Sequence, residues 1–309
     1  MTARLAAAIA ARGRWMLVAG LALGLGWPAA SEAMRPAVGP LVVALLFLAM
    51  LRIGPAGLRI GRRGLGRAVA VVALLQCGLP VALALAFGAL GLLDGPFALG
   101  ALMILAAAPI TGAAHIAAMA GGDPAPGLRL TVIGTALLPL TVVPVFALAP
   151  AFGDAGEVIA AVLRLLLVIL AAGGVALALH RMRIVRGTAA ELTAIDATAA
   201  LLLGAVVVGL MSAAADALRT APGAFAAAMA FVCLLSFGMQ ALVALAARDR
   251  AEAPALAVAS GCRNVALFLG VLPAPVMEGL LLLIGCYQVP MYLAPLVLPR
   301  VLALRRSRA

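Results

Sequence analysis

The chain has no lysine and little charge of any kind. All 22 of its basic residues are arginine, and charged residues make up only 11% of the 309 positions. Aromatic residues are also scarce, at 4%, whereas 66% of the residues are hydrophobic. The mean hydropathy is +1.22. Such a composition excludes a soluble globular protein and predicts an all-α integral membrane protein.

The chain also lacks the residue groups of common metal and catalytic centres. Its four cysteines form no CxxC pair, and it has two histidines, too few for a metal ligand set. No nucleophile–His–acid set lies at membrane depth. We therefore expect no metal, no cofactor and no enzymatic activity. The net charge of +11 does not indicate nucleic acid, because the arginines cluster in alternate loops.

Apolar runs separated by short polar loops predict ten membrane spans. Their approximate ranges are 15–30, 38–54, 66–90, 96–121, 127–150, 157–179, 194–215, 221–247, 254–272 and 276–299. No good cleavage site follows the first run, so we interpret it as a span. Of the 22 arginines, 18 lie in loops on one side and 2 in loops on the other. The positive-inside rule then places both termini in the cytoplasm, in a bacterial inner membrane.

Two spans are interrupted by polar residues and glycine. Segments 109–115 (PITGAAH) and 259–264 (ASGCRN) each place a hydroxyl and a glycine inside an apolar run. Irregular backbone at membrane depth is tolerated only where protein buries it or where it lines a cavity. Paired broken helices point to the binding site of a transporter. The predicted substrate-binding residues are Thr111, Gly112, His115, Ser260, Gly261, Arg263 and Asn264.

A weak internal repeat supports the same interpretation. The span after each break carries two prolines five residues apart, Pro139 with Pro144 and Pro290 with Pro295. A unit of five spans is odd-numbered, so its second copy must enter the membrane inverted. We therefore expect a single transmembrane transporter unit over 1–309, with inverted repeats at about 15–150 and 157–300.

Arg263 is the most informative single residue. A charge near the middle of a span costs roughly 2.5–3.5 kcal/mol on insertion scales and is a functional hypothesis by default. Its guanidinium suits a carboxylate, sulfonate or phosphate, or it bonds to backbone carbonyls of the break. Free N–H groups at the half-helix ends would also favour an anion. Arg164, nearer the end of its span, is expected to reach the interface.

The motifs around the two breaks resemble those of the bile acid:sodium symporter family, over about 15–300. The family's fourth span reads P-G-G-T-A-S-N, which segment 109–115 matches in part. Its ninth span reads E-x-G-x-Q-N, of which Gly261 and Asn264 are present here. This resemblance implies that the broken spans 4 and 9 cross at mid-membrane. It also implies a core of spans 66–150 and 221–300 that moves against a panel of spans 15–54 and 157–215.

The resemblance further implies that the family's two sodium sites are altered in this chain. The first site corresponds to Ala114, His115, Gly127, Thr131 and Ala259, and the second to Gln76, Ala259 and Arg263. Only Gln76 and Thr131 remain as ion-site remnants, and the carboxylate is lost. Two like charges ~4 Å apart repel by ~4 kcal/mol at an effective dielectric of 20. We therefore expect Arg263 to take the place of the ions.

These observations predict a secondary transporter for a small or amphipathic organic anion that works without sodium. Proton coupling through His115 is left open. The alternatives are a sodium-coupled bile-acid-type symporter with relocated ion sites and a non-transporting ligand sensor on the same fold. An arsenite carrier would need a cysteine at the first break, where Ile110 and Thr111 stand. The expected partners are the lipid bilayer and the organic anion.

Overall fold

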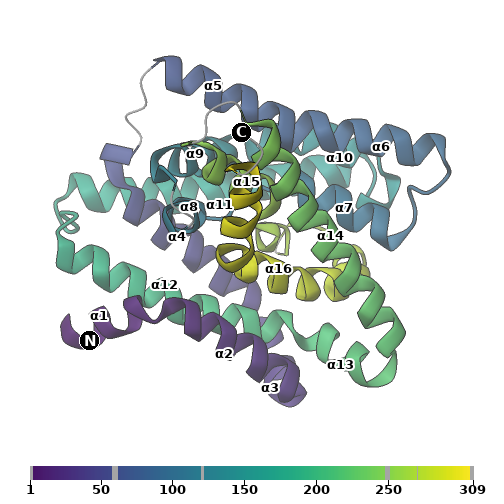
Figure 1. The fold of residues 1–309 in the computed structure, drawn as a ribbon, viewed down its shortest axis with the longest axis horizontal. Helices are drawn as coiled ribbons and strands as arrows, with labels where there is room; N and C mark the ends of the chain where they lie inside the picture. Colours follow the sequence, from purple (N-terminus) through teal and green to yellow (C-terminus); the bar gives the residue numbers. More distant parts are fainter. Residues whose placement is uncertain (1–2, 58–61, 120–121, 248–250, 270, 307–309) are drawn as a thin grey trace. The chain divides into compact units, whose positions relative to one another are not determined.

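The chain folds almost entirely into helices. The computed structural model describes residues 3–57, 62–119, 122–247, 251–269 and 271–306 (Figure 1). About 86% of the described residues are helical. Within the described ranges there is no strand beyond one isolated antiparallel bridge, between Pro109 and Arg263. The prediction of an all-α protein is confirmed.

Seven helical segments are long and apolar enough to cross a membrane. They are Pro28–Pro55, Gly64–Ala89, Pro124–Ala147, Ala155–Arg181, Ala189–Thr220, Pro222–Ala246 and Ala274–Arg300. The chain is therefore a multi-pass membrane protein, as its composition predicts. Ten spans and the inverted repeat stay predictions, because the other three predicted spans are built from shorter helical pieces.

The predicted first span is divided at Trp27. Helix α2 (Gly13–Gly26) ends there, and α3 (Pro28–Met34) begins at the next residue. Trp27 has φ −129° and ψ 79°, outside the helical region, because the residue before a proline is disfavoured in that region. The first apolar run is therefore two helices rather than one.

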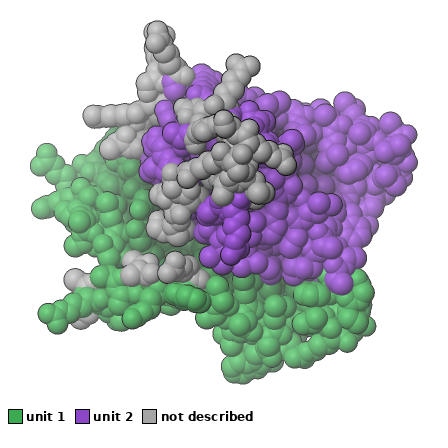
Figure 2. Space-filling model, viewed as in Figure 1, with its two compact units in different colours: residues 1–59, 165–225 green, residues 60–164, 226–309 purple. Residues whose placement is uncertain are grey.

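Contacts divide the chain into two compact units, which Figure 2 colours separately. Unit 1 comprises residues 1–59 and 165–225, and unit 2 comprises residues 60–164 and 226–309. Helices α11 (Ala155–Arg181) and α14 (Pro222–Ala246) each contain one of the boundaries.

Unit 1 is built around α12 (Ala189–Leu210), which packs against α1 (Ala3–Ala11), α2 and α4 (Val38–Gly57). A Cβ atom at Gly20 of α2 would lie 3.0 Å from the carbonyl oxygen of Gly204 in α12. Small residues at such positions let membrane helices approach closely. The unit also contains α3, the 3₁₀ turn η1 (Arg35–Ala37) and α13 (Ser212–Thr220).

Unit 2 contains one short helix that is buried over most of its length. Every residue of α7 (Pro96–Ala106) from Ala98 onward is buried. A helix that is apolar on all sides must lie inside the protein or face lipid. The other elements of unit 2 are α5 (Arg62–Val72), the π-helical segment η2 (Ala73–Gly78), α6 (Leu79–Ala89), α8 (Ala113–Met119), α9 (Pro124–Thr141), α10 (Val143–Ala147), η3 (Pro150–Phe152), α15 (Ala253–Gly261), η4 (Val265–Phe268) and α16 (Ala274–Arg306).

Candidate functional site

The two predicted breaks lie against each other inside unit 2. The first is the non-helical segment 107–112 between α7 and α8, and the second is segment 262–264 between α15 and η4. The N–H of Ile110 donates to the carbonyl of Cys262 at 2.9 Å, and the N–H of Asn264 donates to the carbonyl of Ala108 at 2.8 Å. We call these two paired segments the crossover.

Arg263 lies at the centre of the crossover and is 1% exposed. Its Nε donates to the carbonyl of Ser260 at 3.0 Å. One terminal nitrogen donates to the carbonyl of Ala107 at 3.1 Å, and the other to the carbonyl of Leu75 at 3.0 Å. The guanidinium therefore joins three separate segments of unit 2 through their backbone oxygens.

The Leu75 carbonyl is available because of the local helix geometry. In η2 the N–H of Leu79 bonds to the carbonyl of Leu74, five residues back. In the same pattern the Leu75 carbonyl would pair with residue 80, which is proline and has no N–H. The carbonyl is left without a backbone donor, and the guanidinium of Arg263 supplies one.

The other two acceptors lie at C-terminal helix ends. Ala107 follows the last residue of α7, and Ser260 is in the last turn of α15. Carbonyls at these ends have no intrahelical partner and carry the negative end of the helix dipole. Among the described residues no carboxylate pairs with Arg263. Burying an uncompensated charge costs several kcal/mol, which these oriented carbonyls offset.

Tyr287 of α16 holds the second break from the other side. Its hydroxyl accepts from the N–H of Arg263 at 2.7 Å and donates to the carbonyl of Gly261 at 2.7 Å. The hydroxyl of Ser236 in α14 donates to the same carbonyl, also at 2.7 Å. The hydroxyl of Ser260 is bonded to the carbonyls of Ala257 and Met239. Ser260 and Gly261 are thus fully engaged in holding the break.

The two residues predicted as ion-site remnants, Gln76 and Thr131, also bond to protein. The amide nitrogen of Gln76 donates to the carbonyl of Gly134 at 3.0 Å and to the hydroxyl of Thr141 at 2.8 Å. Its carbonyl oxygen is buried and has no hydrogen-bond partner among the described residues. The hydroxyl of Thr131 donates to the carbonyls of Gly127 and Ile110.

Ala259, the residue predicted to stand at the position of the family's carboxylate, has apolar surroundings. It is 2% exposed and belongs to a buried cluster with Ala68, Val72, Leu130 and Ile133. A carboxylate placed there would be buried among aliphatic side chains, at a large desolvation cost.

The remaining predicted site residues are less enclosed. Thr111 is exposed, and Asn264 is partly buried. Apart from its chain neighbours, no described atom lies within 4 Å of where a Cβ of Gly112 would be. The side chain of His115 lies outside the described residues, although its backbone is part of α8.

The expectation of free N–H groups at the half-helix ends is wrong for four residues of the breaks. The N–H groups of Ile110, Ala113, Arg263 and Asn264 all bond within the protein. The reason is that these N–H groups donate to carbonyls of the opposite break, to a carbonyl of their own turn, or to the hydroxyl of Tyr287.

Sequence reasoning missed Tyr287, Ser236 and the Leu75 carbonyl. A weak signal existed for the first, because Tyr287 is one of only two tyrosines and lies inside an apolar run. Ser236 has a polar neighbour four residues later, Gln240, whose amide nitrogen donates to it at 3.2 Å. Pro80 signals an irregularity in its helix but does not identify the carbonyl that it leaves unpaired.

No protein-family model matches the chain, and no curated protein matches it. The resemblance to the bile acid:sodium symporters therefore stays a prediction that rests on the motifs quoted above.

Proposed function

We propose that this chain is a divergent member of the bile acid:sodium symporter family that transports a small or amphipathic organic anion without sodium. The observation that carries the proposal is the buried guanidinium of Arg263, bonded to three backbone carbonyls at the crossover. A guanidinium bonded to carbonyl oxygens would hold these backbone segments together, as a metal ion bound by the same oxygens would. The charge is covalently attached, so no ion has to bind from solution.

Two further features support a transport mechanism. The paired breaks are the kind of irregular backbone that secondary transporters place at the binding site. Units 1 and 2 have bounds close to those of the predicted panel and core. Movement of the core against the panel, ten spans, an inner-membrane location and cytoplasmic termini all belong to this proposal.

The side of the crossover that is left open would contact the anion. Thr111 is exposed and Gly112 has open space around its Cα, so both are available to a ligand. Asn264 would add a neutral amide. His115 would bind the anion or relay a proton, which would make uptake depend on the pH gradient.

The test is uptake into proteoliposomes of a pool of labelled organic anions, with sodium replaced by choline, at two pH gradients. We expect uptake that is the same in sodium and in choline. A response to the pH gradient would assign proton coupling.

Two outcomes would contradict the proposal. Uptake that requires sodium would show that relocated groups hold the ion. Saturable binding of an anion with no flux under any gradient would instead assign a ligand sensor.

A further inference from the structure

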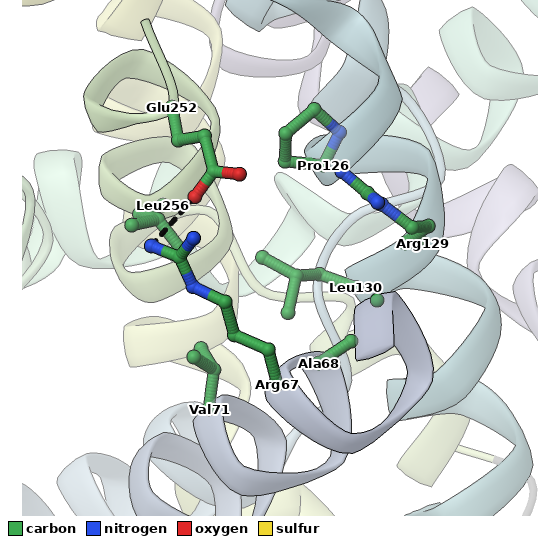
Figure 3. Close-up of a pocket in the computed structure, with 9 residues that line it drawn as sticks. Arg67, Ala68, Val71, Pro126, Arg129, Leu130, Glu252 and Leu256 are labelled. Atoms are coloured by element: carbon green, nitrogen blue, oxygen red, sulfur yellow. Dashed lines mark ion pairs between the residues drawn. The ribbon is translucent and has the colours of Figure 1, made fainter. Parts of the chain in front are cut away.

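A cavity of about 230 Å³ lies in unit 2, among α5, α9 and α15 (Figure 3). Its lining contains none of the residues of the crossover. Glu252 precedes the first residue of α15, and Arg67 and Arg129 lie five residues into α5 and α9. Gly64 and Pro126, the third residues of α5 and α9, also line the cavity, so the first turns of three helices converge there. N-terminal helix ends favour negative charge.

The charges around this cavity do not cancel. Arg67 forms an ion pair with Glu252 at 2.7 Å, drawn as a dashed line in Figure 3. Arg129 lines the cavity from α9 and is partly buried. Within the described part of the chain, no carboxylate pairs with Arg129. Among the described lining residues, two guanidinium groups and one carboxylate leave one net positive charge, which a monoanion would balance.

The rest of the lining is apolar. It consists of Gly64, Ala68, Val71, Pro126, Leu130 and Leu256. Sites for drug-sized ligands occupy about 300–1,000 Å³, so this cavity suits a smaller molecule, with the volume of about eight waters. A cationic group beside aliphatic walls matches an anionic head that carries a short apolar tail.

We infer that this cavity is a binding site for a small organic monoanion, a carboxylate or sulfonate with a short aliphatic tail. Arg129 anchors the anionic head with its planar fork of donors. The aliphatic walls cover the tail. The ion pair with Glu252 engages the guanidinium of Arg67. The anion would therefore bind on the α9 side of the cavity, next to Arg129.

The site differs from the one proposed for transport, and its occupation does not require flux. Two of its lining residues, Ala68 and Leu130, also belong to the apolar cluster that contains Ala259, which lies in α15 just before the crossover segment 262–264. A failure of the transport proposal would leave this inference standing, because the test below measures binding alone.

The test is calorimetric titration of hexanoate into the full chain in phosphatidylcholine nanodiscs, with the neutral hexanamide as a reference ligand. We expect saturable hexanoate binding with a dissociation constant at or below about 1 mM, and no saturable binding of hexanamide. Arg129→Gln should weaken hexanoate binding by roughly tenfold or more, because it removes a charged hydrogen-bonding partner. Arg164→Gln, at an exposed position on α11, removes the same charge elsewhere and should leave the affinity unchanged.

A second variant guards against simple misfolding. Glu252→Gln keeps both arginines and releases Arg67, so it should tighten hexanoate binding, which a damaged protein would not do. The inference is overturned if wild-type protein does not bind hexanoate, if hexanamide binds equally well, or if Arg129→Gln and Arg164→Gln behave alike. Competition by phosphatidylglycerol in the nanodisc, but not by added phosphatidylcholine, would assign the cavity to a lipid headgroup and overturn the small-anion assignment.

Discussion

The position of Arg263 is informative in the sequence alone, but its hydrogen-bond partners are not. Its sequence position alone indicates a charge at membrane depth that needs a partner. The partners are not evident from the sequence, because they are backbone oxygens rather than acidic side chains. The Leu75 carbonyl is 188 positions away and is free only because of a π-helical turn followed by Pro80. Sequence patterns therefore predict the unusual residue but not its ligands.

Gln76 provides a test of the buried polar contacts around the crossover. Replacing it with methionine removes the bonds to Gly134 and Thr141, at 3.0 and 2.8 Å. The variant also removes a buried oxygen that has no partner among the described residues. Removing this oxygen offsets part of the stability lost with the two hydrogen bonds. We expect Gln76→Met to lower the free energy of unfolding by about 1–2 kcal/mol, measured by reversible unfolding in mixed micelles.

Gln288→Met is the matched control. The amide of Gln288 is also buried, but its nitrogen donates to the carbonyl of Ile284, within its own helix, at 3.0 Å. The loss should be smaller than for Gln76→Met. Equal losses for the two variants would mean that the hydrogen bonds of Gln76 to α9 stabilise the fold no more than a bond within one helix does.

At the scale of elements, the positions of both breaks were predictable from sequence, but their neighbours were not. Hydroxyl, glycine and polar residues inside apolar runs predicted breaks at 109–115 and 259–264, and the helices are interrupted at 107–112 and 262–264. The pairing of the two breaks follows from tertiary packing, which a one-dimensional pattern does not contain. The cavity among α5, α9 and α15 was missed for the same reason, since each helix contributes only a few of its lining residues.

The two break glycines should respond differently to a methyl group. A Cβ atom at Gly261 would lie 2.5 Å from Cγ of Gln240 and would overlap the carbonyl of Ser236. At Gly112 the same atom would meet nothing within 4 Å. Gly261→Ala should therefore lower the free energy of unfolding by about 1–3 kcal/mol through overpacking, whereas Gly112→Ala should have little effect.

Thermal unfolding of both variants in one detergent checks this pair. Gly261 is the last residue of α15, where helix propensity favours alanine over glycine. A loss of stability in Gly261→Ala would therefore come from packing rather than from backbone propensity. A Gly261→Ala protein as stable as the wild type would mean that α14 is not packed against the end of α15.

At the scale of the whole molecule, composition alone predicts an all-α membrane protein, and seven long apolar helices agree with it. The number of spans is harder to establish, because three of the ten predicted runs are built from helices that are each too short to cross a membrane. Arginine placement predicts the orientation, through a physical rule that does not depend on the fold.

Cysteine labelling tests that orientation. In a variant whose four native cysteines are replaced, Asp94→Cys and Arg186→Cys each place a thiol at an exposed loop position. The predicted topology puts residue 94 outside and residue 186 in the cytoplasm. A membrane-impermeant maleimide should label the first in intact cells and the second only after permeabilisation. Labelling of both from the same side would contradict the alternation of ten spans.

The measurement that tests the central claim most directly is sodium-free uptake by variants of Arg263. Arg263→Ala removes the guanidinium and leaves three buried carbonyls without their donor. Arg263→Lys keeps the charge but lacks the planar fork. We expect Arg263→Ala to lose roughly tenfold or more of the uptake rate, a barrier change of about 1.4 kcal/mol or more. Arg263→Lys should retain an intermediate rate, and Arg164→Ala should equal the wild type. If Arg263→Ala transports as fast as the wild type in choline, the guanidinium does not replace a coupling ion, and the account is wrong.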